Sequence, residues 1–220
     1  GSVTATFSET NGGASDNIST ETQFIDCIDT GTLDPADATS SLDSETGGQG
    51  NSDTYSLDFS DPVENVSFRV NDVDGDGVVR IQAFDANGDQ IEVELQAGSS
   101  VTLLDTDSVA GADTADSNGG YAPDTTPEYS VLVTIPGPVS EIQILHSQDG
   151  SGNSGINVTD VYFDVPNPSE PEGAGDDTLS GGEGEDLIFG NGGDDSIDGD
   201  AGDDTLFGDD PAAGTVVSGN

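Results

Sequence analysis

Basic residues are almost absent from this sequence of 220 residues, which has 45 Asp and Glu residues against only two Lys and Arg residues. Both basic residues are arginines, Arg69 and Arg80. Phosphate recognition requires Lys and Arg side chains. A net charge of −43 therefore excludes a conventional nucleic-acid partner and argues against anionic membranes. The composition favours cations as partners, or a saline medium that screens the repulsion between carboxylates.

Cysteine is nearly absent as well, and tryptophan and methionine are missing. The single cysteine, Cys27, excludes an internal disulfide, and we interpret it as a small apolar packing residue because no catalytic partner is evident. A secreted chain without disulfides needs another source of stability, and bound metal is the obvious candidate. No run of 18 apolar residues occurs, so we expect no membrane insertion.

Residues 1–166 alternate apolar and polar side chains, which is the pattern of half-buried β-strands, and they show no helical period. One set spans 55–59 and the next spans 66–70, with a turn predicted at Asp61–Pro62 between them. Residues 85–89, DANGD, predict a hairpin turn. Residues 30–51 and 110–127 are read as long loops. The spacing of short strands and turns predicts an all-β fold with a jelly-roll-like β-sandwich.

The composition changes after this region, which gives the expected domain boundaries. The sandwich occupies residues 1–166, and residues 167–171 form a stiff proline-rich linker. Residues 172–210 form a repeat region, and residues 211–220 are expected to be a disordered tail.

The repeat region contains four consecutive units of nine residues: EGAGDDTLS, GGEGEDLIF, GNGGDDSID and GDAGDDTLF, which begin at residues 172, 181, 190 and 199. Each unit has glycine at its fourth position, aspartate at its sixth and a large aliphatic residue at its eighth. The glycines permit a tight turn with positive φ, and the last three residues form a short strand with one inward-facing apolar side chain. Two units complete one coil, so we expect a short parallel β-roll in which the first unit pairs with the third and the second with the fourth.

Carbonyls of the turns and the aspartate carboxylates present hard oxygen ligands, which suit Ca²⁺. Without the ion the aspartates repel one another, and a core of one residue per strand is too thin to offset chain ordering. We therefore predict that the region folds when calcium is plentiful, with about two to four bound ions. The expected ligands are Gly173, Gly175, Asp177, Gly182, Gly184, Asp186, Asn191, Gly193, Asp195, Asp200, Gly202 and Asp204.

These four units resemble the RTX (haemolysin-type) calcium-binding nonapeptide repeat, GGxGxDxUx. The second unit matches fully, whereas Glu172, Asn191 and Asp200 replace a preferred glycine. The resemblance implies an extracellular or cell-surface protein of a bacterium, exported by type I secretion and folded by external calcium. Segments 56–68, 130–145 and 155–165 resemble the galactose-binding-like sandwiches that precede such repeats in exported proteins of marine bacteria.

Further metal candidates lie in the sandwich. Asp72, Asp74 and Asp76 form a D-x-D-x-D-G run, as in the beginning of an EF-hand loop, but position twelve is Ala83 and strands flank the run. It is therefore either a strand-to-strand calcium loop or an acidic turn. Glu9 and Asp160 are weaker candidates, by analogy with jelly rolls whose chain ends share an ion.

No catalytic constellation is recognisable, so the protein is not expected to be an enzyme. The only histidine, His146, is interpreted as a surface residue at a strand end. A carbohydrate-binding, lectin-like sandwich is the leading hypothesis, with Tyr121 as a candidate ligand contact and calcium assisting because tryptophan is absent. The alternative is a structural or adhesive module of a cell surface or biofilm, rigidified by calcium and without a small ligand.

Overall fold

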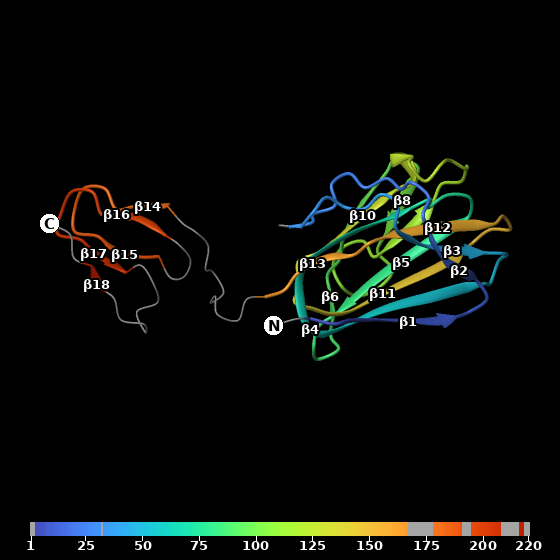
Figure 1. The fold of residues 1–220 in the computed structure, drawn as a ribbon, viewed down its shortest axis with the longest axis horizontal. Helices are drawn as coiled ribbons and strands as arrows, with labels where there is room; N and C mark the ends of the chain where they lie inside the picture. The colour runs from blue at the N-terminus through green and yellow to red at the C-terminus, as the bar shows by residue number, and fades with distance from the viewer. Residues whose placement is uncertain (1–2, 32, 167–177, 191–194, 208–215, 218–220) are drawn as a thin grey trace. The chain divides into compact units, whose positions relative to one another are not determined.

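The computed structural model describes residues 3–31, 33–166, 178–190, 195–207 and 216–217. The chain forms two units, residues 1–166 and 167–220, each of which is described by itself. Apart from one short 3₁₀ helix at Pro127–Tyr129, the regular structure in the described residues is β-strand (Figure 1). The all-β fold class predicted from the sequence is confirmed.

The first unit is a sandwich of two antiparallel sheets. Sheet A contains β1 (Ala5–Asn11), β4 (Ser52–Asn71), β11 (Val139–Gln148), β5 (Gly77–Phe84), β6 (Gln90–Ile91), β9 (Thr114–Ser117) and β8 (Val101–Leu104). Sheet B contains β2 (Ser15–Ser19), β3 (Ser41–Thr46), β12 (Ser154–Thr159), β13 (Tyr162–Asp164), β10 (Val131–Ile135) and β7 (Glu94–Ala97), together with the end of β4.

Strand β4 belongs to both sheets, which makes them continuous along one hydrogen-bonded path. Its first half pairs with β1 and β11, and its second half pairs with β10, β12 and β13. The register with β11 shifts between Val139 and Glu141, opposite the part of β4 that contains Pro62. Proline has no N–H to donate and is tolerated at such an irregularity. The turn predicted at Asp61–Pro62 is therefore wrong, because the chain continues from one sheet into the other.

The predicted loops also contain strands. Strand β3 lies within residues 30–51, where it pairs with β2 and β12, and β9 lies within residues 110–127, where it pairs with β5 and β8. Both strands are rich in Ser, Thr and Asp, so their composition resembles that of a loop. The hairpin at residues 85–89 is confirmed, since it joins β5 to β6 with Ala83 opposite Ile91.

The core lies between the two sheets and follows the predicted alternation. Strand β5 alternates buried and half-buried residues along its whole length. Phe68 and Val133 are fully buried and lie opposite each other on β4 and β10. All buried apolar side chains of the described residues belong to this unit.

The expected surface position of His146 is wrong, because β11 extends past it to Gln148 and carries the ring into the sandwich. His146 is fully buried, with Nδ1 2.8 Å from Oγ of Ser44 and Nε2 3.2 Å from Oγ of Ser154. Tyr55 donates to the same Ser44 oxygen at 2.7 Å. Burial lowers the pKa of His146 to about 4. The imidazole is therefore a neutral link between the two sheets.

Cys27 also differs from its expected role, since it is exposed and has a φ of +67°. It lies in the loop between β2 and β3, outside the packed strands.

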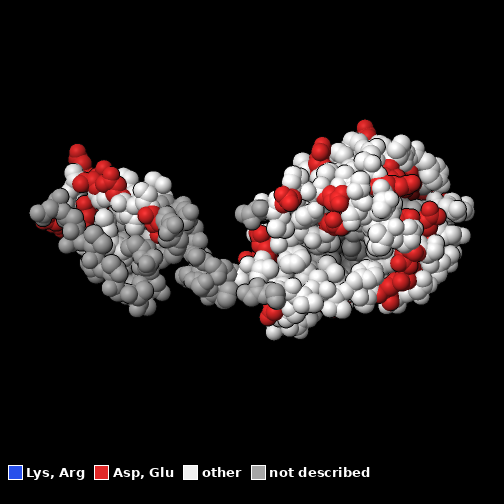
Figure 2. Space-filling model, in the orientation of Figure 1, with Lys and Arg blue, Asp and Glu red and all other residues white. Residues whose placement is uncertain are grey.

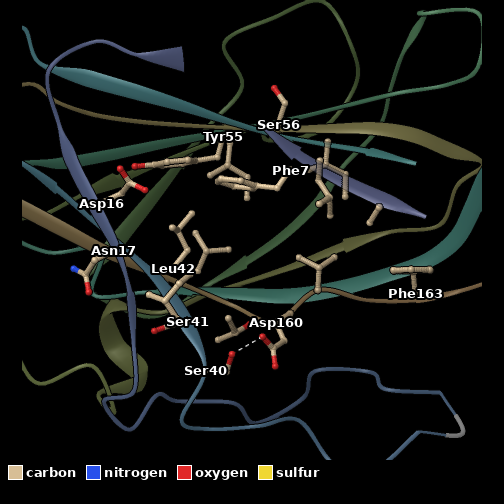
Figure 3. A pocket seen from close by; sticks show the side chains of 18 residues that line it. Phe7, Asp16, Asn17, Ser40, Ser41, Leu42, Tyr55, Ser56, Asp160 and Phe163 are labelled. Carbon is tan, nitrogen blue, oxygen red and sulfur yellow. Dashed lines mark hydrogen bonds between the residues drawn. The ribbon is translucent and has the colours of Figure 1, made fainter. Parts of the chain in front are cut away.

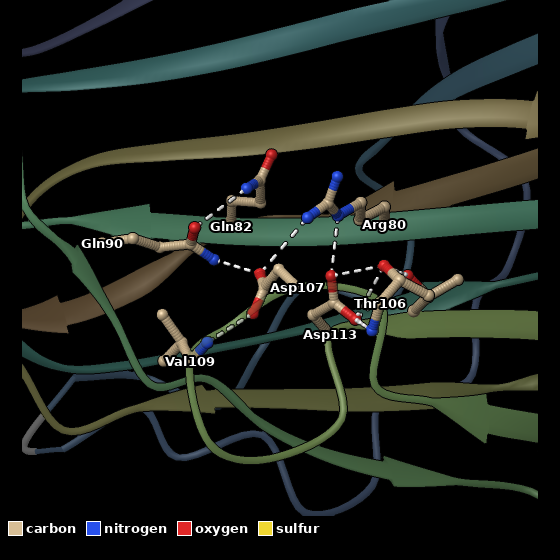
Figure 4. Close-up of polar contacts among 8 residues, drawn as sticks. Arg80, Gln82, Gln90, Thr106, Asp107, Val109 and Asp113 are labelled. Carbon is tan, nitrogen blue, oxygen red and sulfur yellow. Dashed lines mark hydrogen bonds and ion pairs between the residues drawn. The ribbon is translucent and has the colours of Figure 1, made fainter.

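A polar network fixes the loop that connects β8 to β9 against sheet A (Figure 4). Arg80 donates from Nε to Asp113 at 2.7 Å and from a terminal nitrogen to Asp107 at 3.2 Å. Thr106 donates to Asp113 from its amide and its hydroxyl. Burial alone would raise the pKa of Asp113, but the hydrogen bonds from Thr106 and the charge of Arg80 outweigh it and lower the pKa. The guanidinium therefore has a structural role here.

The second unit contains four three-residue strands and one two-residue strand in its described residues. The strand β14 (Thr178–Ser180) pairs in parallel with β16 (Ser196–Asp198), and β15 (Leu187–Phe189) pairs in parallel with β17 (Thr205–Phe207). Leu179 lies opposite Ile197, and Ile188 lies opposite Leu206. The pairing of alternate units predicted for a parallel β-roll is confirmed. A short strand β18 (Val216–Val217) pairs antiparallel with β17, so these two residues differ from the disordered tail expected over 211–220.

Candidate metal centres

Two six-residue turns lie next to each other on one edge of the repeat unit, at residues 181–186 and 199–204. Backbone hydrogen bonds join them, from the amide of Gly184 to the carbonyl of Ala201 and from the amide of Ala201 to the carbonyl of Gly182, both at 2.9 Å. The amide of Asp186 donates to Oδ1 of Asp204 at 3.0 Å. The parallel pairing of the strands thus brings the aspartates of the second and fourth units to one place.

The turns require glycine for conformation and for space. Gly182 and Gly184 have φ values of +93° and +132°, which side chains disfavour. A Cβ at Gly181 would lie 2.8 Å from Oδ2 of Asp186 and 2.9 Å from the carbonyl of Gly199. A Cβ at Gly202 would overlap the carbonyl oxygen of Gly184. The glycines therefore form a cradle in which backbone oxygens and carboxylates approach closely.

The surroundings of the Asp186 carboxylate indicate whether this cradle suits a cation. Its Oδ2 atom is buried and has no hydrogen-bond partner within the described residues. A buried, unpartnered carboxylate oxygen is strongly unfavourable unless a cation or a donor compensates it. A cluster of carboxylate and carbonyl oxygens of this kind is what Ca²⁺ prefers. The residues present therefore fit calcium.

Asp200 occupies a position where the repeat prefers glycine, and it adopts a φ of +60°. Its carboxylate accepts hydrogen bonds from the amide of Gly182 at 3.2 Å and from the hydroxyl of Ser180. Asp200 therefore joins the two coils as well as adding negative charge at this edge.

The structure thus places six of the predicted ligands together on one edge: Gly182, Gly184, Asp186, Asp200, Gly202 and Asp204. Asp195 precedes β16 and belongs to the turn of the third unit. The remaining predicted ligands, Gly173, Gly175, Asp177, Asn191 and Gly193, lie outside the described residues.

The acidic loop of the sandwich connects β4 to β5. Its three carboxylates, those of Asp72, Asp74 and Asp76, have different partners. Asp74 is buried and accepts a hydrogen bond from the amide of Ala122 at 2.8 Å. Asp76 accepts from the amide of Gly152 at 2.5 Å, in the loop between β11 and β12. Asp72 is half-buried with a φ of +58°. Asp72 and Asp74 are close enough to interact, whereas Asp76 binds a different loop.

Electrostatics identify further members of this cluster. Burial, followed by the negative charges of Asp74 and Asp124, raises the pKa of Asp72 to about 8, and Asp43 adds to the effect. Burial also raises the pKa of Asp74. Sequence reasoning missed Asp124 and Asp43, because they come from a loop and from β3 and only the fold brings them to Asp72.

Tyr121 lies at this same end of the sandwich. Its side chain is 71% exposed, and its hydroxyl donates to the carbonyl of Asn153 at 3.3 Å. A Cβ at Gly152 would lie 3.0 Å from the Tyr121 hydroxyl oxygen and 2.8 Å from Oδ2 of Asp76. The ring therefore stands in solvent beside the acidic loop.

The weaker candidates Glu9 and Asp160 have different neighbours. Glu9 on β1 groups with Asp16 on β2 and Asp53 on β4, with one carboxylate oxygen of each within 4.8 Å of the others. Asp160 accepts a hydrogen bond from the hydroxyl of Ser40 at 2.7 Å. The sequence reasoning did not select Asp53, although alternation places it on the same face of the strand as Tyr55; the structure shows that both residues are buried.

Residues 173–210 match the RTX calcium-binding nonapeptide repeat family in four copies. This match confirms the resemblance, and this part of the chain consists of calcium-binding repeats. No curated protein matches the chain. Within the described residues, no helix has the length and apolar character needed to cross a membrane.

Several solved structures resemble the chain at low sequence identity. TmCBM61, solved with β-1,4-galactotriose, is 9% identical with a TM-score of 0.35, and the match covers 71% of this chain and 86% of that one. A family 11 carbohydrate-binding module from Clostridium thermocellum, solved with a β-1,3-1,4-mixed-linked tetrasaccharide, is 10% identical with a TM-score of 0.31, covering 71% and 87%. The enzymatically active domain of tailspike protein 4 of bacteriophage CBA120 is 13% identical with a TM-score of 0.39; the match covers 73% of this chain and 19% of that one.

Proposed function

We propose that this chain is an exported bacterial protein whose repeat unit folds on calcium outside the cell and whose sandwich binds a carbohydrate with the help of a further calcium ion. The observation that carries the calcium part of the proposal is the buried, unpartnered Oδ2 of Asp186, enclosed by glycine turns in a region that matches a calcium-binding repeat. Export by a type I system belongs to the same proposal, and the match to the nonapeptide repeat supports it.

Calcium supplies a positive charge that offsets the aspartates and fixes the turns on each edge of the roll. The chain's own residues provide the rest. The strand pairs hold the coils in register, and the glycines allow backbone oxygens to face the carboxylates. At least one ion on the edge formed by Asp186 and Asp204 is proposed, and the opposite edge formed by the first and third units is expected to hold another.

The sandwich site is proposed at the end that carries Asp72, Asp74 and Tyr121. Carboxylates that are held partly out of water without a basic partner favour a bound cation, and Asp124 contributes a further charge. The exposed Tyr121 ring offers a flat apolar face to the C–H side of a sugar. In this proposal Asp72 and Asp74 hold the ion, and sugar hydroxyls complete its ligands next to that ring.

A glycan array that includes neutral and acidic polysaccharides, run with calcium and with EGTA, tests this function. We expect calcium-dependent binding that is lost in Tyr121→Ala and in Asp124→Asn. The matched control is Asp85→Asn, which changes the same charge in the distant β5–β6 hairpin. Silence of the array combined with calcium-induced self-association, measured by light scattering, would contradict the carbohydrate function and favour the structural or adhesive alternative.

A further inference from the structure

The two sheets of the sandwich are open on one side, between their edge strands. Strand β1 pairs only with β4, and β2 pairs only with β3, among the described residues. Every residue of β1 is exposed, and so is every residue of β2 except the half-buried Ser19. The space between these strands is therefore not closed by packing.

A pocket of about 450 Å³ occupies this opening (Figure 3). This volume lies within the range that is common for small-molecule sites. Most of its lining is hydrocarbon, contributed by both sheets and including Phe7, Leu42, Tyr55, Ile142, Val158 and Phe163. The pocket therefore reaches the inner faces of the sheets rather than the outer surface.

Large apolar side chains remain in solvent at the mouth of the pocket. Phe7 is 52% exposed although its ring stacks on Tyr55 with the centroids 6.0 Å apart, and Ile18 on the opposite strand is 74% exposed. Exposed apolar groups that flank a hollow mark sites of interaction more often than isolated surface residues do. Their positions on β1 and β2 indicate that the hollow receives an apolar group.

The charges around the mouth have one sign. Asp16 and Asp160 both line the pocket, and Figure 3 shows hydrocarbon side chains between them. No Lys or Arg is among the lining residues. Arg69 is held by Asp26 and Ser130, and Arg80 by Asp107 and Asp113. On the face drawn in Figure 2, the described part shows scattered carboxylates and no basic residue.

We propose that this pocket binds a small amphiphilic cation, a molecule with a hydrocarbon body and a protonated amino group. The body lies against Phe7, Leu42 and Val158, and the amino group lies beside one of the two rim carboxylates, Asp16 or Asp160. An anionic amphiphile such as a carboxylate is repelled. The site is separate from the proposed carbohydrate site, since neither Tyr121 nor Asp74 lines it.

Fluorescence of N-phenyl-1-naphthylamine, a neutral probe that brightens in apolar surroundings, tests the pocket in the full chain with calcium at fixed ionic strength. We expect the fluorescence to rise on binding and then to fall when octylamine displaces the probe. Octanol should displace it at a higher concentration than octylamine, and octanoate should be weakest. Each carboxylate contributes about a two- to five-fold preference for the amine, as expected for an exposed charge pair.

Variants on β1 and at the rim locate the site. Ala5 lines the pocket on an exposed strand, so Ala5→Trp should fill it and abolish the probe signal without unfolding the protein. Thr6→Trp is the matched control, because Thr6 is the next residue of the strand and does not line the pocket. The double variant Asp16→Asn, Asp160→Asn should retain the probe but bind octylamine no better than octanol.

The proposal is overturned by an absence of probe binding, by equal displacement with octanoate and octylamine, or by an Ala5→Trp variant that binds the probe normally. Probe fluorescence per protein molecule that grows on dilution would also overturn the proposal. Dilution dissociates a dimer, so this result would mean that a second copy of the chain occupies the pocket. Circular dichroism of each variant distinguishes a filled pocket from an unfolded chain.

Discussion

The sandwich and the repeat unit differ in what they bury. The sandwich encloses an apolar core from both sheets, with Phe68 and Val133 at its centre. In the repeat unit the inward-facing Leu179, Ile188 and Ile197 are only half-buried, and the buried Oδ2 of Asp186 lacks a hydrogen-bond partner in the described residues. One unit is thus stabilised by hydrocarbon and the other must be stabilised by an ion.

The comparison shows that high negative charge has different consequences in the two units. In the sandwich a buried carboxylate such as Asp113 is compensated by Arg80, and the pair Asp72 and Asp74, which has no basic partner in the described residues, is the exception. In the repeat unit the carboxylates repeat every nine residues and the strand pairing stacks them on one edge. The sandwich is therefore stable despite its acidic composition, whereas the folding of the repeat unit depends on calcium.

Replacing one phenylalanine by alanine in each unit tests most sharply the difference in what the two units bury. Phe68→Ala removes a fully buried ring and should lower the free energy of unfolding of the sandwich by about 3–5 kcal/mol. Phe189→Ala removes a ring that is 40% exposed and stacked on Phe207, and should cost about 1 kcal/mol. Chemical denaturation in saturating calcium measures both, and equal losses would contradict the difference in burial.

The pH dependence of the sandwich provides a second test, through His146. Its pKa in the folded protein is about 4, below the ordinary value of 6.5, so the unfolded chain takes up the proton first. Stability is then full above pH 6.5 and declines as the pH falls towards 4, by about 3 kcal/mol in total. We expect the advantage of the native protein over His146→Gln to shrink across this interval in calcium-saturated unfolding curves. A constant difference between the two proteins would show that the neutral ring is unimportant.

In the repeat unit the smallest informative change is the loss of one negative charge. Asp186→Asn should raise the calcium concentration needed for folding by about tenfold, because the unpartnered oxygen is neutralised and calcium gains less. Asp203→Asn, in the exposed neighbouring position of the opposite turn, removes the same charge and should change the midpoint far less. Calcium titrations followed by circular dichroism compare the two variants, and equal shifts would mean that net charge rather than ligation controls folding.

Local sequence pattern was sufficient where neighbours along the chain determine structure. The nine-residue period predicted the pairing of Ile188 with Leu206, and the DANGD turn predicted the hairpin of β5 and β6. Alternation also identified Tyr55 and Phe59 as buried residues of β4 before Pro62, whereas both faces of β4 are buried from Val66 to Asn71.

Features that depend on distant segments could not be predicted in this way. The passage of β4 between the sheets depends on β10 and β11, and the burial of His146 depends on Ser44 and Ser154. The pocket likewise arises because β1 and β2 leave their inner faces uncovered, and neither strand carries a strong apolar pattern.

Hydrogen–deuterium exchange of the full chain, with calcium and with EGTA, tests most directly the claim that hydrocarbon stabilises one unit and calcium the other. The amides of β15 and β17 should be protected in calcium and exchange rapidly in EGTA, while those of β5 and β11 should stay protected in both. Protection of β15 and β17 in EGTA, or loss of protection in β5 and β11 together with them, would contradict the account.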